Sequence, residues 1–169
     1  MHNSAALSEI IKCDSDFRIA RDGTWFYQGS PLNRQAMVRL FSTILTRDDD
    51  GAYWLKTPAE QCRIEVEDVP FTMIALRVRD LENGQTLCFK TNVNEWVAVD
   101  DAHPLALQPD PKTGDMVPYI LVREGLYAKL NRSTYYELME FMLNRGEMEN
   151  GVRGLKSAGT FFPLESKKL

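Results

Sequence analysis

Apolar and polar positions follow two different periods along this chain. Apolar residues recur at spacings of three and four over 37–45 and again over 135–143, which predicts two amphipathic helices. The other apolar stretches are short and are interrupted by polar residues, as is typical of β-strands. Asp-Gly at 22–23 and Asn-Gly at 83–84 each predict a hairpin, because glycine adopts a positive φ without steric cost. The chain is therefore expected to contain many strands and few helices.

The signals at the helix ends predict the extent of both helices. Asn33 is the expected cap of the first helix, which should end at the acidic run 48–51. Asn131 or Ser133 is the expected cap of the second, which should run to about Asn144. The predicted strands are 17–20, 24–27, 52–55, 63–69, 71–79, 86–91, 96–99, 118–122, 126–130 and 160–164.

The order of these elements suggests an internal duplication. A hairpin followed by a helix occurs twice, and Arg21-Asp22-Gly23 and Arg123-Glu124-Gly125 mark the two turns. The alternative is that any two amphipathic helices that follow hairpins align this well. The predicted fold is α+β with mostly antiparallel sheets, in which two duplicated hairpin-plus-helix units pack together.

Three segments follow from this pattern. Residues 1–15 are expected to form an N-terminal helix or tail, residues 16–70 a first α+β unit, and residues 71–169 a second. Four prolines and glycines over 104–114 predict a loop-rich connector near 100–117.

Composition and charge exclude several classes of protein. The chain has 169 residues, 44% of them hydrophobic, which is too many for a disordered chain. No apolar run is long enough for a membrane helix. The net charge of −4 argues against a general nucleic-acid binder, which needs a basic surplus. The three cysteines (Cys13, Cys62 and Cys88) are odd in number and widely spaced, so we expect no disulfide framework and a cytoplasmic protein.

Three sequence strings resemble a known family. They are Asp22-Gly23-Thr24-Trp25 with 29–34, the segment 53–60 followed by 64–71, and Pro118-Tyr119 with 122–126. Together these strings are similar to a proteobacterial domain of unknown function, the DUF1285 family, over about residues 16–165. The resemblance implies an α+β architecture with repeated structural motifs and suggests a ligand-binding or signalling role. It supplies no catalytic set and no cofactor.

The strongest candidate for binding is a glycine-rich segment near the C-terminus that carries two cations. Flexible backbone and positive charge can form a nest of N–H groups around an anion. Arginines near the two hairpins could add planar forks for a carboxylate or a phosphate. The predicted ligand-binding residues are Arg34, Arg123, Arg153, Gly154, Lys156, Ser157 and Gly159. The alternative is a plain glycine loop before the last strand, with the arginines paired to nearby carboxylates.

An enzymatic role is the second hypothesis. Glu60, Glu67 or Asp68 could act as a base with His103, as in a small hydrolase. His103 also follows two aspartates, Asp100 and Asp101, and such a set could bind zinc or iron; we expect a solvated turn and no metal site there. A protein-interaction scaffold, with a protein partner or a homodimer, is the third hypothesis. A non-enzymatic module that binds an anionic small molecule or transmits a signal is favoured, without a cofactor, nucleic acid or membrane as partner.

Overall fold

Strands form most of the chain, and the predicted α+β class is wrong. The computed structural model describes residues 11–82 and 84–165, and for residues 11–15 the backbone alone. Strands account for 51% of the chain and helices for 15%, in three sheets, one of them a half-barrel. The backbone divides into two compact units, Met1–Asp68 and Val69–Leu169. The prediction for residues 1–10 lies outside the described residues.

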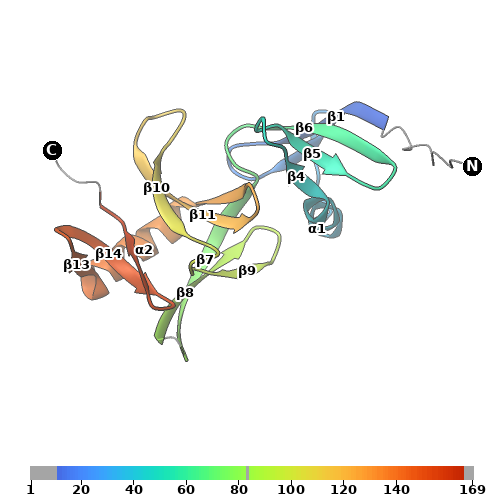
Figure 1. The fold of residues 1–169 in the computed structure, drawn as a ribbon. Coiled ribbons are helices and arrows are strands. Elements are labelled where there is room, and N and C mark those ends of the chain that lie inside the picture. Colours follow the sequence, from blue (N-terminus) through green and yellow to red (C-terminus); the bar gives the residue numbers. More distant parts are fainter. Residues whose placement is uncertain (1–10, 83, 166–169) are drawn as a thin grey trace, which may run out of the picture. The chain divides into compact units, whose positions relative to one another are not determined.

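The N-terminal unit is a six-stranded sheet with one helix (Figure 1). The strand order is β3-β2-β1-β6-β5-β4, and all neighbours are antiparallel except β1 and β6. The hairpin predicted at 22–23 is confirmed, because Phe17 pairs with Tyr27 and Ile19 with Trp25. The elements are β1 (Ile11–Ile19), β2 (Trp25–Tyr27), β3 (Ser30–Pro31), α1 (Gln35–Thr43), β4 (Leu45–Arg47), β5 (Tyr53–Lys56) and β6 (Glu60–Val66).

The first helix is shorter than predicted. It begins after Arg34, not Asn33, and ends at Thr43. Leu45 continues the helical spacing in sequence, but it pairs with Leu55 in the sheet and is 2% exposed. The acidic run beyond it is therefore a hairpin turn between β4 and β5 and not a helix exit. Asp48 closes that turn by accepting hydrogen bonds from the Ala52 amide and the Trp54 indole, both at 2.8 Å.

A disulfide is present in this unit, contrary to expectation. Cys62 is disulfide-bonded, and its Cα partner in the parallel ladder between β1 and β6 is Cys13. Cys88, in the other unit, is a free thiol. The odd number and wide spacing of the cysteines therefore did not exclude a single disulfide bond. The parallel pairing of β1 with β6 brings two cysteine positions that are distant in sequence side by side.

The C-terminal unit combines a six-stranded half-barrel, a three-stranded sheet and a helix (Figure 1). The half-barrel has the order β10-β11-β12-β7-β8-β9, and the small sheet has the order β13-β14-β15. The second helix begins as predicted, because the side chain of Asn131 accepts a hydrogen bond from the Thr134 amide. The elements are β7 (Phe71–Leu81), β8 (Gly84–Thr91), β9 (Trp96–Ala98), β10 (Leu105–Pro109), β11 (Met116–Arg123), β12 (Leu126–Leu130), α2 (Arg132–Arg145), β13 (Glu147–Glu149), β14 (Val152–Ser157) and β15 (Thr160–Pro163).

The two units are not duplicates. Each helix follows a hairpin, but α1 has 9 residues and α2 has 14. In the first unit the opening strand of the hairpin, β1, has the parallel neighbour β6, whereas in the second it is the closing strand, β12, that runs parallel to β7. The helical periodicity alone could not reveal this difference, because strand pairing is long-range.

Candidate functional site

The predicted anion loop is a hairpin in the structure. Gly154 and Ser157 lie in β14, and Gly159 lies in the turn to β15 with a φ of +82°. A side chain at Gly154 would meet the Phe162 carbonyl oxygen at 2.2 Å, so this glycine permits close packing of strands. The segment therefore lacks the loop of free amides that the anion hypothesis assumed.

The polar side chains of this hairpin have structural partners. Ser157 is fully buried, accepts a hydrogen bond from the Leu87 amide at 2.9 Å and donates one to the Val99 carbonyl at 2.6 Å. Lys156 is exposed and forms an ion pair with Glu147 at 3.4 Å. Anion binding by Arg153 and Lys156 stays a prediction, which replacement of both by alanine would test.

The predicted arginines fall in separate units. Arg34 precedes α1 in the N-terminal unit. Arg123 ends β11 in the C-terminal unit, and its guanidinium lies over the Phe71 ring at 5.5 Å.

The residues of the hydrolase hypothesis are also divided. Glu67 belongs to the N-terminal unit, where it pairs with Arg18 and accepts a hydrogen bond from the Arg21 amide at 2.8 Å. Glu60 and Asp68 lie in the same unit, whereas His103 lies in the other. The carboxylates of this hypothesis and its histidine therefore belong to different units.

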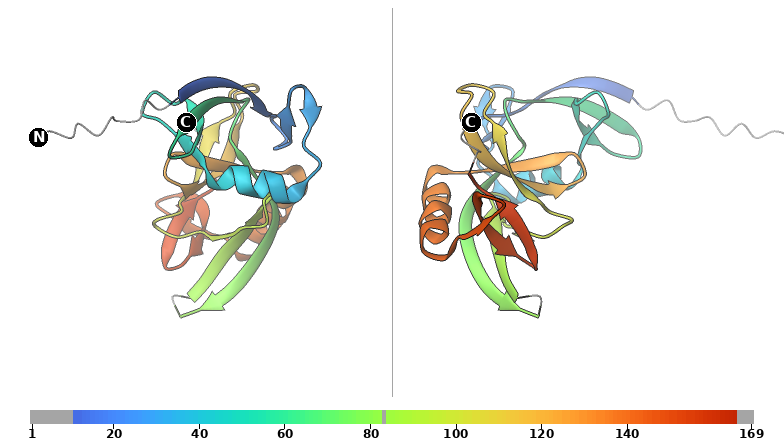
Figure 2. Two further views of the ribbon diagram at one scale, coloured as in Figure 1. Left: turned by 90° about the vertical axis from the view of Figure 1, so that its right-hand side faces the viewer. Right: turned by 60° about the vertical axis from the view of Figure 1, so that its left-hand side comes forward.

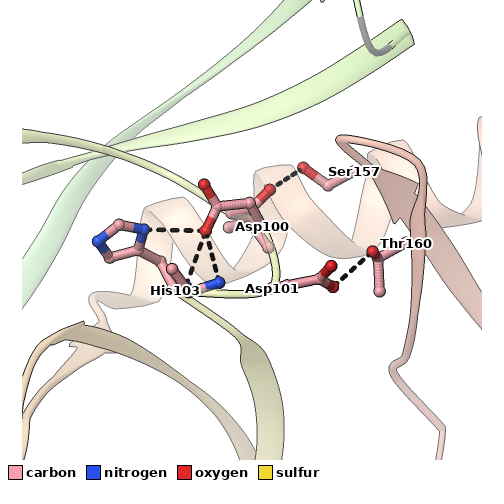
Figure 3. Close-up of polar contacts among 7 residues, drawn as sticks. Asp100, Asp101, His103, Ser157 and Thr160 are labelled. Carbon is pink, nitrogen blue, oxygen red and sulfur yellow. Dashed lines mark hydrogen bonds and ion pairs between the residues drawn. The ribbon is translucent and has the colours of Figure 1, made fainter.

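His103 and the two aspartates form a turn that is held by its own hydrogen bonds (Figure 3). One oxygen of Asp100 accepts from the His103 amide at 2.8 Å and contacts His103 Nδ1 at 2.9 Å. Asp101 points the other way and accepts from the Thr160 hydroxyl at 2.6 Å. Within residues 16–82 and 84–165, whose side chains the structure describes, there is no group of three His, Cys, Asp or Glu that could hold a metal ion.

A cavity of about 440 Å³ lies in the N-terminal unit beside β5 and β6. Its polar lining carries both a cation, Arg63, and a carboxylate, Glu65. The lining is therefore of mixed charge. The complete lining is Gly51, Ala52, Tyr53, Arg63, Ile64, Glu65 and Val66.

A different group of cations gathers on one face of the half-barrel. Leu87 and Phe89 are fully buried on one face of β8, so Cys88 and Lys90 point to the opposite face. Arg77 is the register partner of Cys88, and Trp96 is the register partner of Lys90. Paired residues share a face, so these side chains lie together. We call Arg77, Arg79, Cys88, Lys90 and Trp96 the basic face.

Among the described residues, the cations of the basic face have no acidic partner. In the part of the chain that the structure describes, Arg77, Arg79 and Lys90 form no ion pair and no side-chain hydrogen bond. The other positions on this face of β7, β8 and β9 hold no carboxylate: Ala75, Leu81, Gly84, Thr86 and Ala98. This local excess of positive charge contrasts with the net charge of −4 for the whole chain.

An aromatic ring and a thiol complete the basic face. The guanidinium carbon of Arg77 lies 4.8 Å from the centre of the Trp96 ring, which is 42% exposed. Burial raises the pKa of the Cys88 thiol, and the positive charges of Arg79 and Arg77 oppose that rise. Arg77 is the register partner of Cys88, and Arg79 lies two positions further along the same face of β7.

Sequence reasoning missed the basic face. The alternation Leu76-Arg77-Val78-Arg79 does signal that two arginines share one side of a strand. Their proximity to Lys90 and Trp96 depends on the register among three strands, which the sequence does not provide.

Comparison with known families agrees with the division of the chain. A family model described as the N-terminal domain of DUF1285, a domain of unknown function, matches residues 10–69. A second, described as the C-terminal domain of a protein of unknown function (DUF1285), matches residues 70–164. The chain belongs to the DUF1285 family. The resemblance seen in the sequence is thereby confirmed.

Two solved DUF1285 structures are similar to this one. The first, a DUF1285 family protein from Silicibacter pomeroyi DSS-3, is 44% identical with a TM-score of 0.83, over 95% of this chain and 86% of that one. The second, a DUF1285 family protein from Shewanella baltica OS155, is 27% identical with a TM-score of 0.58, over 75% of this chain and 91% of that one. No curated protein matches the chain. Neither described helix is long and apolar enough to cross a membrane.

Proposed function

We propose that this DUF1285 protein is a non-enzymatic binding module that recognises an anionic group through the basic face. The observation that carries the proposal is the set of three cations, Arg77, Arg79 and Lys90, that share one sheet face without a carboxylate partner among the described residues. Charges of one sign on a rigid sheet create a local field that attracts the opposite charge.

The residue types on this face fit a carboxylate or a phosphate. Arginine presents a planar fork of donors that can bind either group through two hydrogen bonds. The ring of Trp96 supports Arg77 from one side, which restricts the guanidinium before a ligand arrives. A smaller loss of side-chain entropy on binding favours affinity.

Tripolyphosphate is a suitable probe, because it is small, strongly anionic and transparent in the near ultraviolet. Its binding to the intact protein would be measured by titration calorimetry at low ionic strength. Replacement of Arg77 and Arg79 by glutamine should reduce the affinity at least about ten-fold, since each lost charged hydrogen bond contributes about 1.5–3 kcal/mol.

The matched control removes two cations from elsewhere in the same unit. Arg132 and Arg145 are exposed at the two ends of α2, and the double variant Arg132→Gln, Arg145→Gln has the same net charge as the test variant. The control should bind tripolyphosphate nearly as the parent protein does. Equal weakening in both double variants would show that net charge, not the basic face, attracts the probe and would contradict the proposal.

A further inference from the structure

The strand that carries Arg77 and Arg79 has an unpaired edge. β12 pairs with β7 only at Phe71–Met73, and the carbonyl of Met73 accepts a hydrogen bond from the Asn131 amide where the chain turns into α2. Beyond this point β7 pairs with β8 on one side, and no described strand pairs with its other side. Both views of Figure 2 show the β7–β8 hairpin (green) extending beyond the other strands of its unit.

The register shows which backbone groups face this edge. Leu81 pairs with Gly84 across a connection of two residues, so these two residues exchange both of their backbone hydrogen bonds. From this pair on, hydrogen-bonded and non-hydrogen-bonded pairs alternate along the two strands. Arg79 and Arg77 therefore bond to β8, whereas Leu76, Val78 and Asp80 direct their amides and carbonyls to the other edge.

Contacts of β8 support this register independently. Leu87 is the partner of Val78, and it directs its amide to Ser157 and its carbonyl to the Val99 amide, away from β7. Gln85, the partner of Asp80, directs its carbonyl to the Ala158 amide. Among the described residues, no hydrogen bond reaches the backbone of Leu76, Val78 or Asp80 from the open side.

Side chains beside this edge differ between its two faces. Arg77 and Arg79 lie on the basic face, and Leu76, Val78 and Asp80 lie on the opposite face, where Val78 is 36% exposed. A strand added at this edge would place alternate residues against arginine on one face and, at Leu76 and Val78, against aliphatic side chains on the other. The edge therefore matches a segment in which acidic and apolar residues alternate.

A second copy of this chain matches the edge poorly. If two β7 edges paired antiparallel about Val78, Arg77 of each copy would lie opposite Arg79 of the other. Like charges directly opposite each other destabilise a strand pair. Charge complementarity thus favours an acidic partner over self-association.

We infer that the open edge of β7, from Leu76 to Asp80, binds an extended acidic peptide segment of another protein as an additional strand. This inference rests on the proposed function, because Arg77 and Arg79 would bind the acidic side chains. It adds that main-chain hydrogen bonds from Leu76 and Val78 hold the ligand, so that the natural ligand is a protein segment.

The test uses the intact protein and a fluorescent eight-residue peptide that alternates glutamate and valine. Val78→Pro removes the outward amide without removing a bond to β8, and proline is tolerated at such edge positions. Val78→Ala keeps the amide and is the matched control. We expect Val78→Pro to weaken peptide binding about ten-fold, as expected for the loss of one or two backbone hydrogen bonds, and to leave tripolyphosphate binding unchanged.

Two further measurements keep the inference falsifiable if Val78→Pro does not fold. Peptide binding to the parent protein should slow amide hydrogen exchange at Leu76 and Val78, and a peptide N-methylated at alternate residues should bind more weakly. Unchanged exchange, or equal binding of the methylated peptide, would overturn strand addition even if tripolyphosphate still binds. A dimer in light scattering that Val78→Pro dissociates would show that the edge pairs with itself and would also overturn it. Failure of both probes to bind would overturn the proposed function as well.

Discussion

Arg77 and Trp96 meet across the intervening strand β8, with the guanidinium carbon 4.8 Å from the centre of the indole ring. The contact is diagonal, because Arg77 pairs with Cys88 and Trp96 pairs with Lys90. A cation over an exposed tryptophan contributes about 0.5–1 kcal/mol, so the contact orders the arginine more than it stabilises the fold. It also connects three strands that share one outward face.

The thiol beneath these arginines reports on their charge. Burial raises the pKa of Cys88 above its usual 9.0, and Arg79 and Arg77 limit the rise. Alkylation requires the thiolate, so iodoacetamide should modify Cys88 more slowly at pH 8 than it modifies an unhindered thiol. The variant Arg77→Gln, Arg79→Gln should shift the alkylation profile to still higher pH, as measured by peptide mapping across pH 7–10.

The control for that experiment is Arg132→Gln, Arg145→Gln, whose alkylation profile should match the parent protein. The raised pKa of Cys88 also predicts how the free energy of unfolding depends on pH. The neutral thiol is favoured in the folded state, so the contribution of Cys88 is complete below the unfolded pKa and is lost as the pH rises through the folded pKa. An alkylation profile that moves to lower pH in the arginine double variant would contradict the assigned cause.

Ser157 is predicted to support the fold and not to bind a ligand. It is fully buried and joins β8 to the chain after β9 through hydrogen bonds with Leu87 and Val99. Ser157→Ala should lower the free energy of urea unfolding by about 2 kcal/mol, because two buried backbone groups lose a partner. Thr160→Val, which removes an exposed hydroxyl bond to Asp101, should cost less than about 1 kcal/mol. Equal losses in both variants would contradict the structural role.

These outcomes show how far the sequence predicts the structure. The hairpin at 22–23 was predictable because its signal is local, and so was the cap at Asn131. The helix predicted to 48 was too long, since the apolar spacing of Leu45 suits a buried strand position equally well. The fold class was wrong because the sheet pairings that dominate it join residues far apart in sequence, such as β12 with β7.

The candidate site was less predictable than the fold. The glycines and cations after residue 150 have the composition of an anion loop, but the same composition suits a tight hairpin with a buried serine. The basic face carries no motif at all, because its residues are single alternate positions on three separate strands. Only the register of β7, β8 and β9 brings these residues together.

Gly154 is predicted to tolerate no side chain. An added Cβ would lie 2.2 Å from the Phe162 carbonyl oxygen and 2.8 Å from the Pro163 Cα. Gly154→Ala should therefore destabilise the protein by about 1–3 kcal/mol or more, since backbone atoms of β15 must shift. Lys156→Ala, two residues away and exposed, should change the unfolding free energy by less than about 1 kcal/mol, as for a surface ion pair. A neutral Gly154→Ala would contradict the strand pairing described here.

A buried ion pair fixes the loop after β10. Asp110 is 4% exposed, pairs with Lys129 of β12 and accepts a hydrogen bond from the Lys112 amide at 2.8 Å. Lys129→Met would leave the carboxylate buried without its cation and should cost about 3–5 kcal/mol in unfolding free energy. Adding Asp110→Asn should recover part of that loss. Asp110→Asn can be introduced alone into the parent protein or added to Lys129→Met. An equal loss of unfolding free energy in the two cases would show that the two side chains are not coupled.

The most direct test of the account follows the Trp96 indole N–H and the Arg77 side-chain N–H by two-dimensional NMR during titration with tripolyphosphate. We predict that both signals shift together in a saturable manner, that the backbone amide of Lys90 moves with them, and that the Arg145 side-chain signal on α2 stays in place. Saturable shifts confined to residues away from the basic face, or no shift at low ionic strength, would contradict anion recognition by this face.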